Sequence, residues 1–221
     1  TVTVSDVSVS GTQLNAQGIY GRGVEVGGGA SVSVTRSRFS DNHSAGLWAY
    51  NSGTTVTVSD VWVSNTQPNA DGLFGFGIEA GNGASLSVSG SRMSDNHSSG
   101  IAAFDSNTTL IVSEVWVSNT QSNADGSFGF GIDAAKGASL SVSGSRVSDN
   151  HKAGITASGL GTTVTVGEVW VSGNELEGLS AGGRALVVVD GASLSVSRTR
   201  VSNSCSTGIL ASGSNTSATA A

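Results

Sequence analysis

Apolar and polar residues alternate along most of this chain in short runs. In residues 55–63, Val56, Val58, Val61 and Val63 are separated mainly by Ser and Thr. A period of two places alternate side chains on opposite faces of a strand, so one face of each run is apolar. Segments rich in Gly and Asn separate the runs and mark turns. The pattern predicts an all-β chain built from many short strands.

The same pattern returns at a spacing of 54 residues. The triplet Ser-Asp-Val begins at Ser5 and again at Ser59, and related triplets begin at Ser113 and Gly167. No insertion or deletion changes this spacing through the four copies. Loops of ordinary domains vary in length, so a constant spacing indicates stacked repeating units.

Each repeat divides into a long coil, such as residues 55–83, and a short coil, such as residues 84–108. Each coil contains three alternating runs. The residues expected to point inwards in this repeat are Val56, Val58, Val61, Val63, Ile78, Ala80, Leu86, Val88, Met93, Ile101 and Ala103.

One coil cannot bury its apolar face, but about eight stacked coils can, in a rod on the order of 38 Å long. A propeller blade needs four antiparallel strands, and a sandwich does not keep a fixed spacing. We therefore predict a parallel β-helix, or β-solenoid, as one domain over residues 1–212. Its units are 1–54, 55–108, 109–162 and 163–212, and residues 213–221 form a flexible polar tail. The chain starts within a strand pattern, so we expect a segment of a longer rod.

Composition narrows the function. The 221 residues include 32 Gly and one Pro, and the net charge is −6. An acidic chain without basic patches does not favour nucleic acid or an anionic membrane as a partner. No apolar run reaches the roughly 18 residues of a membrane span. The single Cys205 excludes an internal disulfide.

The segment Ser-Asp-Asn-His-x-x-Gly-Ile, at residues 94–101 and 148–155, resembles the pectin-lyase-like superfamily of right-handed parallel β-helices. That resemblance implies a right-handed helix and an extracellular or cell-surface location. It leaves activity open, because the fold includes lyases, hydrolases, epimerases, adhesins and phage spikes. The hydrolases carry close Asp pairs, Gly-His-Gly and Arg-x-Lys, and none of these occurs here. We therefore predict no catalytic residue and favour a non-enzymatic protein.

Equivalent positions of successive coils form surface rows. The centre of the second strand of each coil alternates between Arg and Trp and is expected to face outwards. This Arg/Trp ladder consists of Arg38, Trp62, Arg92, Trp116, Arg146, Trp170 and Arg200. A guanidinium over an indole ring is a favourable contact, which stabilises the stack. The alternative is a carbohydrate-binding strip, because sugars stack on Trp and hydrogen-bond to Arg.

Two further rows carry metal-binding residue types. His43, His97 and His151 alternate with Gln or Glu, so they lie roughly 10 Å apart, too far to share zinc. The acidic row of Glu25, Glu79 and Asp133 also occupies alternate coils and does not supply the six to eight oxygens of calcium. We predict no metal or cofactor; Ca²⁺ on the loops near Asp71 and Asp125 is a weaker expectation.

Asn residues and loop aromatics complete the candidates. Asn42, Asn96 and Asn150 are expected to form a hydrogen-bonded ladder at a corner of the coil. Gly-rich loops, as at residues 67–77 and 121–131, carry the aromatic rim. The rim consists of Tyr20, Phe74, Phe76, Phe128 and Phe130. We expect these rings to fold back over the rod, because large exposed apolar patches are unfavourable; an exposed adhesive rim is the alternative.

These observations favour a non-catalytic, structural or adhesive β-helix of an extracellular or cell-surface protein, with polysaccharide or neighbouring protein chains as partners. A polysaccharide-binding or polysaccharide-degrading protein is the first alternative. The Ser and Thr rows of the first strand suggest a second alternative, an ice-binding solenoid, although Ile111 interrupts them.

Overall fold

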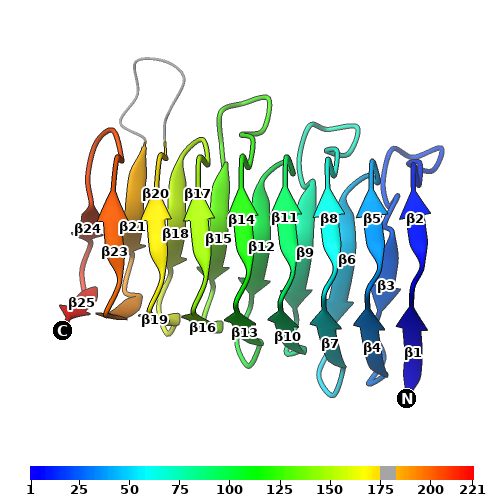
Figure 1. Cartoon of the computed structure of the whole chain (residues 1–221), viewed down its shortest axis with the longest axis horizontal. Helices are drawn as coiled ribbons and strands as arrows, with labels where there is room; N and C mark the ends of the chain where they lie inside the picture. The colour runs from blue at the N-terminus through cyan, green and yellow to red at the C-terminus, as the bar shows by residue number, and fades with distance from the viewer. Residues whose placement is uncertain (175–182) are drawn as a thin grey trace.

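The computed structural model describes residues 1–174 and 183–221. The regular secondary structure in these ranges consists of β-strands (Figure 1). The strands form three sheets. Sheet A contains, in order, β1 (Val2–Ser5), β4 (Ser31–Thr35), β7 (Thr55–Ser59), β10 (Ser85–Ser89), β13 (Thr109–Ser113), β16 (Ser139–Ser143), β19 (Thr163–Gly167), β22 (Ser193–Ser197) and β25 (Ser217–Ala220).

The other two sheets each take one strand from every coil. Sheet B contains β2 (Ser8–Ser10), β5 (Arg38–Ser40), β8 (Trp62–Ser64), β11 (Arg92–Ser94), β14 (Trp116–Ser118), β17 (Arg146–Ser148), β20 (Trp170–Ser172) and β23 (Arg200–Ser202). Sheet C contains β3 (Val24–Val26), β6 (Ala45–Tyr50), β9 (Phe76–Gly81), β12 (Ser99–Phe104), β15 (Phe130–Ala135), β18 (Ala153–Ser158), β21 (Arg184–Val189) and β24 (Ile209–Ser212).

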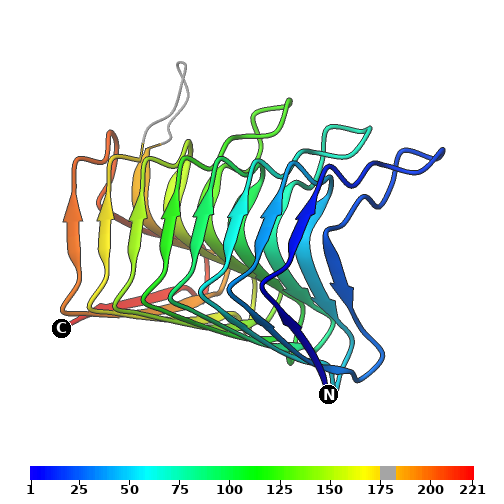
Figure 2. The same ribbon diagram turned by 45° about the vertical axis from the view of Figure 1, so that its right-hand side comes forward.

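Each strand pairs in parallel with the equivalent strand of the next coil. In sheet A, for example, Val58 pairs with Val88, which pairs in turn with Val112. Seen obliquely, the coils stack as nearly identical rungs around one interior (Figure 2). The predicted parallel β-helix of about eight coils is therefore confirmed.

The interior is filled by the inward positions of all three sheets. Every residue predicted to point inwards between Val56 and Ala103 is at most 2 % exposed. Val, Leu and Ile stack on equivalent residues of the neighbouring coils and form one continuous core along the rod. This burial is the main stabilising contribution, at about 25 cal/mol for each Å² of apolar surface removed from water.

The end of the chain differs from the prediction of a flexible tail over residues 213–221. Ser217–Ala220 forms β25, which pairs in parallel with β22, and Thr216 Oγ1 accepts a hydrogen bond from the backbone N–H of Gly191. The segment Ser-Ala-Thr-Ala keeps the two-residue period of sheet A. Its backbone groups therefore extend the ladder of β22, which would otherwise have an unpaired edge.

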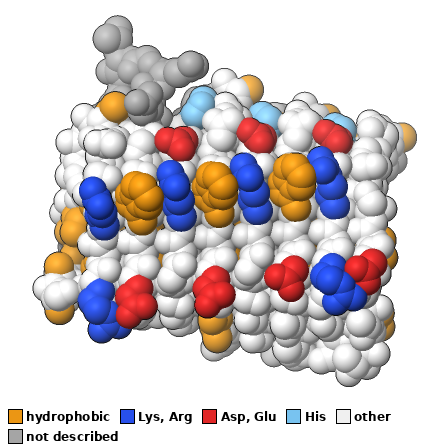
Figure 3. All heavy atoms as spheres, viewed as in Figure 1, with side chains coloured by type: hydrophobic (Ala, Val, Ile, Leu, Met, Phe, Trp, Pro, Cys, Tyr) orange, Lys and Arg blue, Asp and Glu red, His pale blue; other side chains and the backbone are white. Residues whose placement is uncertain are grey.

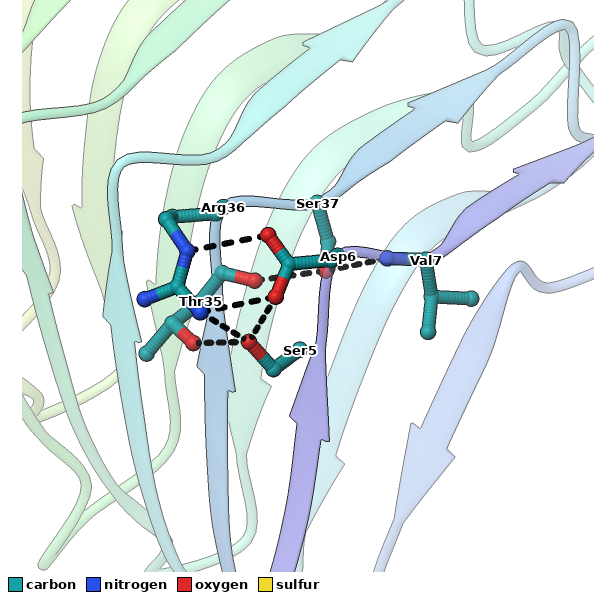
Figure 4. Close-up of polar contacts among 6 residues, drawn as sticks. All are labelled: Ser5, Asp6, Val7, Thr35, Arg36 and Ser37. Carbon is teal, nitrogen blue, oxygen red and sulfur yellow. Dashed lines mark hydrogen bonds and ion pairs between the residues drawn. The ribbon is translucent and has the colours of Figure 1, made fainter.

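A single residue in the left-handed conformation turns the chain from sheet A into sheet B. Asp6 (φ 57°) and Arg36 (φ 44°) occupy this position in the first two coils. Arg36 Nε and Nη2 donate to the two carboxylate oxygens of Asp6, at 2.9 and 2.7 Å (Figure 4). At the other end of the rod Arg198 Nε donates to one carboxylate oxygen of Glu168, at 2.9 Å. Opposite charges thus face each other where the row of bends begins and ends.

The corner between sheets B and C holds the predicted Asn ladder. Asn42, Asn96 and Asn150 are fully buried. Asn96 Oδ1 accepts a hydrogen bond from the N–H of Thr66, and Asn96 Nδ2 donates to the carbonyl of Val63. Each such Asn therefore satisfies backbone groups of the preceding coil at a turn where no strand does so.

We predict that Asn96→Ala lowers the free energy of unfolding by about 2–3 kcal/mol, because it leaves buried backbone groups without partners. Asn65→Gly is the matched control: Asn65 is exposed, has φ 54°, and Gly retains that backbone conformation. We expect the control to lower the free energy of unfolding by less than about 1 kcal/mol. Urea denaturation followed by circular dichroism measures both variants. Equal effects of the two changes would contradict the structural role of the ladder.

Candidate ligand-binding cleft

The Arg/Trp ladder lies on sheet B as one continuous row. Strand pairing places Trp62 beside Arg92, Arg92 beside Trp116, and so on to Arg200. Figure 3 shows the row as alternating basic and apolar side chains across one face of the rod. On the closer side, the distances from guanidinium carbon to indole centroid are 4.0 Å for Arg38–Trp62, 4.1 Å for Arg92–Trp116 and 4.3 Å for Arg146–Trp170.

Each indole of the ladder has an arginine on both sides. The second guanidinium lies 5.3–5.9 Å from the centroid: Arg92 beside Trp62, Arg146 beside Trp116 and Arg200 beside Trp170. The three indoles remain 38–40 % exposed. A sugar that stacks on Trp needs a free ring face, and here the faces contact arginine. This geometry favours a stabilising role, and ligand binding by the ladder stays a prediction.

We predict that Trp116→Ala lowers the free energy of unfolding by about 2 kcal/mol, because it removes two cation–π contacts and the apolar contact area of the ring. Ile111→Thr is the control, since Ile111 is 49 % exposed on sheet A and Thr matches its row. We expect the control to lower the free energy of unfolding by less than about 1 kcal/mol. The comparison requires urea denaturation of both variants, and equal midpoints would contradict a stabilising ladder.

The loop aromatics gather over sheet C. Phe76 is 4 % exposed and packs with Ala45 and Ala102, whereas Phe74 stays 46 % exposed and Tyr20 51 % exposed. The Phe76 ring contacts those of Phe104 and Phe128 at centroid distances of 5.6 and 6.4 Å, and all these contacts are edge to face. Phe76 therefore folds back over the rod, as predicted, whereas Phe74 and Tyr20 remain exposed at the margin.

The phenylalanine rings, but not Tyr20, line a cleft of about 610 Å³ along sheet C. Its volume lies within the range of small-molecule sites, roughly 300–1,000 Å³. The acidic row supplies two carboxyl groups, Glu79 and Asp133, while Phe104, Asp105, Lys136, Lys152 and Arg184 also line the cleft. Sequence reasoning missed these five. For Phe104 a signal was available in the sequence. Alignment of the coils places Phe104 beside Ala135 of the next coil, near the loops that carry phenylalanine.

The carboxyl groups of Glu79 and Asp133 are both largely removed from water. Burial raises the pKa of Glu79 to about 7 and that of Asp133 to about 6. The hydroxyl of Thr156 donates to Asp133, and this hydrogen bond opposes part of the shift. Ala102 stands between the two acids in the strand register, so they do not form a close pair.

The first repeat fills the corresponding place with its own side chains. Arg22 Nη1 forms an ion pair with Glu25 Oε2 at 2.8 Å, and its guanidinium lies 3.7 Å from the centroid of Trp48. The other side of Trp48 stacks on Tyr50, with ring centroids 4.1 Å apart. A smaller hollow of about 340 Å³ adjoins this cluster and shares Phe74 and Glu79 with the cleft.

The remaining candidate residues serve local structure. His43 and His97 bridge to the Gln of the next coil, and Nδ1 of each lies near a carbonyl of the preceding coil. In the loop at residues 67–77, Asn69 Oδ1 accepts hydrogen bonds from the N–H groups of Asp71 and Leu73. In the parts of the chain that the structure describes, no three His, Cys, Asp or Glu residues are grouped to hold a metal ion. Calcium on the loops stays a prediction.

The raised pKa values predict a stability that falls as the pH rises. Between about pH 4 and pH 7 the folded chain holds protons on Glu79 and Asp133 that the unfolded chain releases, so ionisation favours unfolding. We expect a loss on the order of 3 kcal/mol per carboxyl at most. Urea denaturation at pH 4.5 and pH 8 measures this loss. The double variant Glu79→Gln, Asp133→Asn should show a flatter profile, and an unchanged profile would contradict the assignment.

Comparison with known proteins identifies the fold family. A family model described as "Right handed beta helix region" matches residues 1–176. The chain therefore belongs to the right-handed β-helix family, and the handedness expected from the Ser-Asp-Asn-His segments is confirmed. No curated protein matches the sequence.

A solved structure titled "Crystal structure of Agl-KA catalytic domain" is similar, with 12 % sequence identity and a TM-score of 0.45. The similarity covers 98 % of this chain and 45 % of that one, so this chain spans less than half of that domain. Across the described ranges, the structure contains no helix long and apolar enough to cross a membrane.

Proposed function

We propose that this chain is a non-catalytic β-helix segment of an extracellular or cell-surface protein, and that it binds its partner in the sheet C cleft. The observation that carries the proposal is the cleft itself. Five phenylalanine rings, from two loops and three strands, line a hollow together with the carboxyl groups of Glu79, Asp105 and Asp133. A concave, mostly apolar site with a few polar groups is the usual form of a ligand site.

The placement of the acids supports a binding role over catalysis. Glu79 and Asp133 are separated by the coil that carries Ala102, and the Asp133 carboxylate already accepts hydrogen bonds from Thr156 and from the N–H of Ala134. The other surface rows repeat from coil to coil, which suits a rod that presents a surface. Polysaccharide and neighbouring protein chains remain the proposed partners of the assembled rod.

An NMR fragment screen tests the cleft as the binding site. We expect chemical-shift changes to concentrate on backbone amides of β9, β12, β15 and β18. Phe128→Ala removes part of the cleft wall and should weaken most hits, whereas Trp116→Ala on sheet B should leave them unchanged. Hits that map to the Arg/Trp ladder, or that survive Phe128→Ala, would contradict the proposal.

Polysaccharide hydrolysis is the second candidate function, and one observation favours it. Two strand spacings place the acid-bearing strands about 9.6 Å apart along the rod, just beyond the roughly 6.5–9.5 Å that separates the carboxyl groups of inverting glycosidases, so side-chain rotation toward each other would bring the acids within that range. Reducing-end assays on neutral and uronate polysaccharides test it. Product release by the wild type that disappears in both Glu79→Gln and Asp133→Asn would establish hydrolysis and overturn the non-catalytic proposal.

A further inference from the structure

The repeat provides an internal comparison between the two ends of the sheet C row. The 54-residue spacing places Arg22, Phe76, Phe130 and Arg184 at one equivalent position. Three residues further along, the acidic row has Glu25, Glu79, Asp133 and Val187 at its equivalent position. An arginine therefore begins and ends the row, but only Arg22 has a carboxylate at the equivalent acidic position.

In the first repeat the arginine is neutralised within the chain. Glu25 Oε2 lies 2.8 Å from Arg22 Nη1. In the fourth repeat, Val187 takes the place of that glutamate, and Arg184 lines the cleft. Arg184 forms no ion pair with any described residue, and its buried Nε has no hydrogen-bond partner among them. A buried guanidinium nitrogen without an acceptor among the described residues is unfavourable, so this position favours an anionic partner.

A second cation lies next to Arg184. Lys152 precedes β18, and its backbone carbonyl accepts a hydrogen bond from the N–H of Arg184 in the adjacent coil. The Lys152 ammonium also lines the cleft, 5.8 Å from the centroid of Phe130, and donates to the carbonyl of Gly126. Like Arg184, it has no carboxylate partner among the described residues. Two basic side chains without an ion-pair partner among the described residues therefore line this part of the cleft.

The rest of the cleft is mostly apolar, although Glu79, Asp105, Asp133 and Lys136 also line it. Phe130, Val187, Val189 and Leu210 line it near the two cations, and the Phe104 and Phe128 rings extend it toward Glu79. The phenylalanines meet edge to face, so they do not form a row of parallel faces on which sugar rings stack. The lining suits an apolar or aromatic body.

We infer that the cleft binds a small amphiphilic organic anion, whose carboxylate or sulfonate pairs with Arg184 and Lys152 and whose apolar or aromatic body lies along the phenylalanines. This inference rests on the proposed binding role of the cleft and adds the class of ligand. The anionic group takes the part that Glu25 plays toward Arg22 in the first repeat. Arg–carboxylate pairs of this kind are favoured by two parallel N–H donors.

Two fluorescent probes with the same ring system test the inference. 1-Anilinonaphthalene-8-sulfonate carries an anionic group, and N-phenyl-1-naphthylamine lacks it. We expect the sulfonate to bind the wild type at least about ten-fold more tightly, since a charge-assisted contact in a partly buried site is worth that factor. Phe128→Ala should weaken both probes, because it removes a wall of the cleft.

The decisive variants are Val187→Glu and its uncharged match, Val187→Gln. The glutamate restores the arrangement of Arg22 and Glu25, so it should neutralise Arg184 and weaken the sulfonate about ten-fold relative to the glutamine. The neutral probe should distinguish the two variants by less than about two-fold. Arg184→Gln should weaken the sulfonate similarly, whereas Arg198→Gln, a cation at the bend between sheets A and B, should not. Circular dichroism and thermal midpoints establish that each variant is folded.

The outcomes separate the inference from the proposed function. Equal binding of both probes, or equal effects of Val187→Glu and Val187→Gln on the sulfonate, would overturn the anionic ligand class. A trigalacturonate that displaces the sulfonate as effectively as a long-chain carboxylate would overturn the apolar body. Fragment hits in the cleft would still support the proposed binding site in either case. Only the loss of those hits as well would remove the site itself.

Discussion

The structure depends on one constraint, the parallel in-register pairing of each coil with the next. Val58, Val88 and Val112 illustrate it: each pairs with its equivalent one coil away. Hydrogen bonds between coils satisfy the backbone, and the same pairing buries the apolar face that a single coil leaves exposed. A shift of one residue would turn the apolar residues outwards. The constant repeat length is therefore a requirement of the stack.

The two-coil period determines what the surface carries. Because like residues recur in alternate coils, each exposed row combines two chemistries at strand spacing. On sheet B this places a guanidinium beside each indole, with Arg92 between Trp62 and Trp116. At the corner, buried Asn96 accepts a hydrogen bond from the N–H of Thr66, which belongs to the preceding coil. In such rows, each side chain already has its partner in a neighbouring coil. This explains why the Arg/Trp ladder, the most regular feature of the sequence, is a less suitable binding surface than the cleft.

The sequence predicted the fold and the rows because both follow from spacing. Val56, Met93 and Ile101 are buried as the two-residue period requires. The cleft follows from spacing only in part. Equivalent positions identify Glu79 and Asp133 as neighbours in one row, but the path of a Gly-rich loop depends on left-handed residues such as Phe74 (φ 65°) and Phe128 (φ 61°), which no periodicity indicates. Burial of the acids, and hence their raised pKa values, results from that path. The tail was misjudged because Ala and Ser in β25 give a weak strand pattern.

The proposed binding site lies where the repeat is broken. Lys152 replaces the serine found at Ser44 and Ser98, Arg184 replaces phenylalanine, and Val187 replaces an acid. A fully regular row would place Phe and a carboxyl group at every second coil and would be the same along its whole length. The departures of the third and fourth repeats instead put two cations without carboxylate partners among the described residues beside the last phenylalanine. Regular stacking thus provides a rigid support. A few substitutions in one corner provide the basic side chains that would orient the anionic group of a bound ligand.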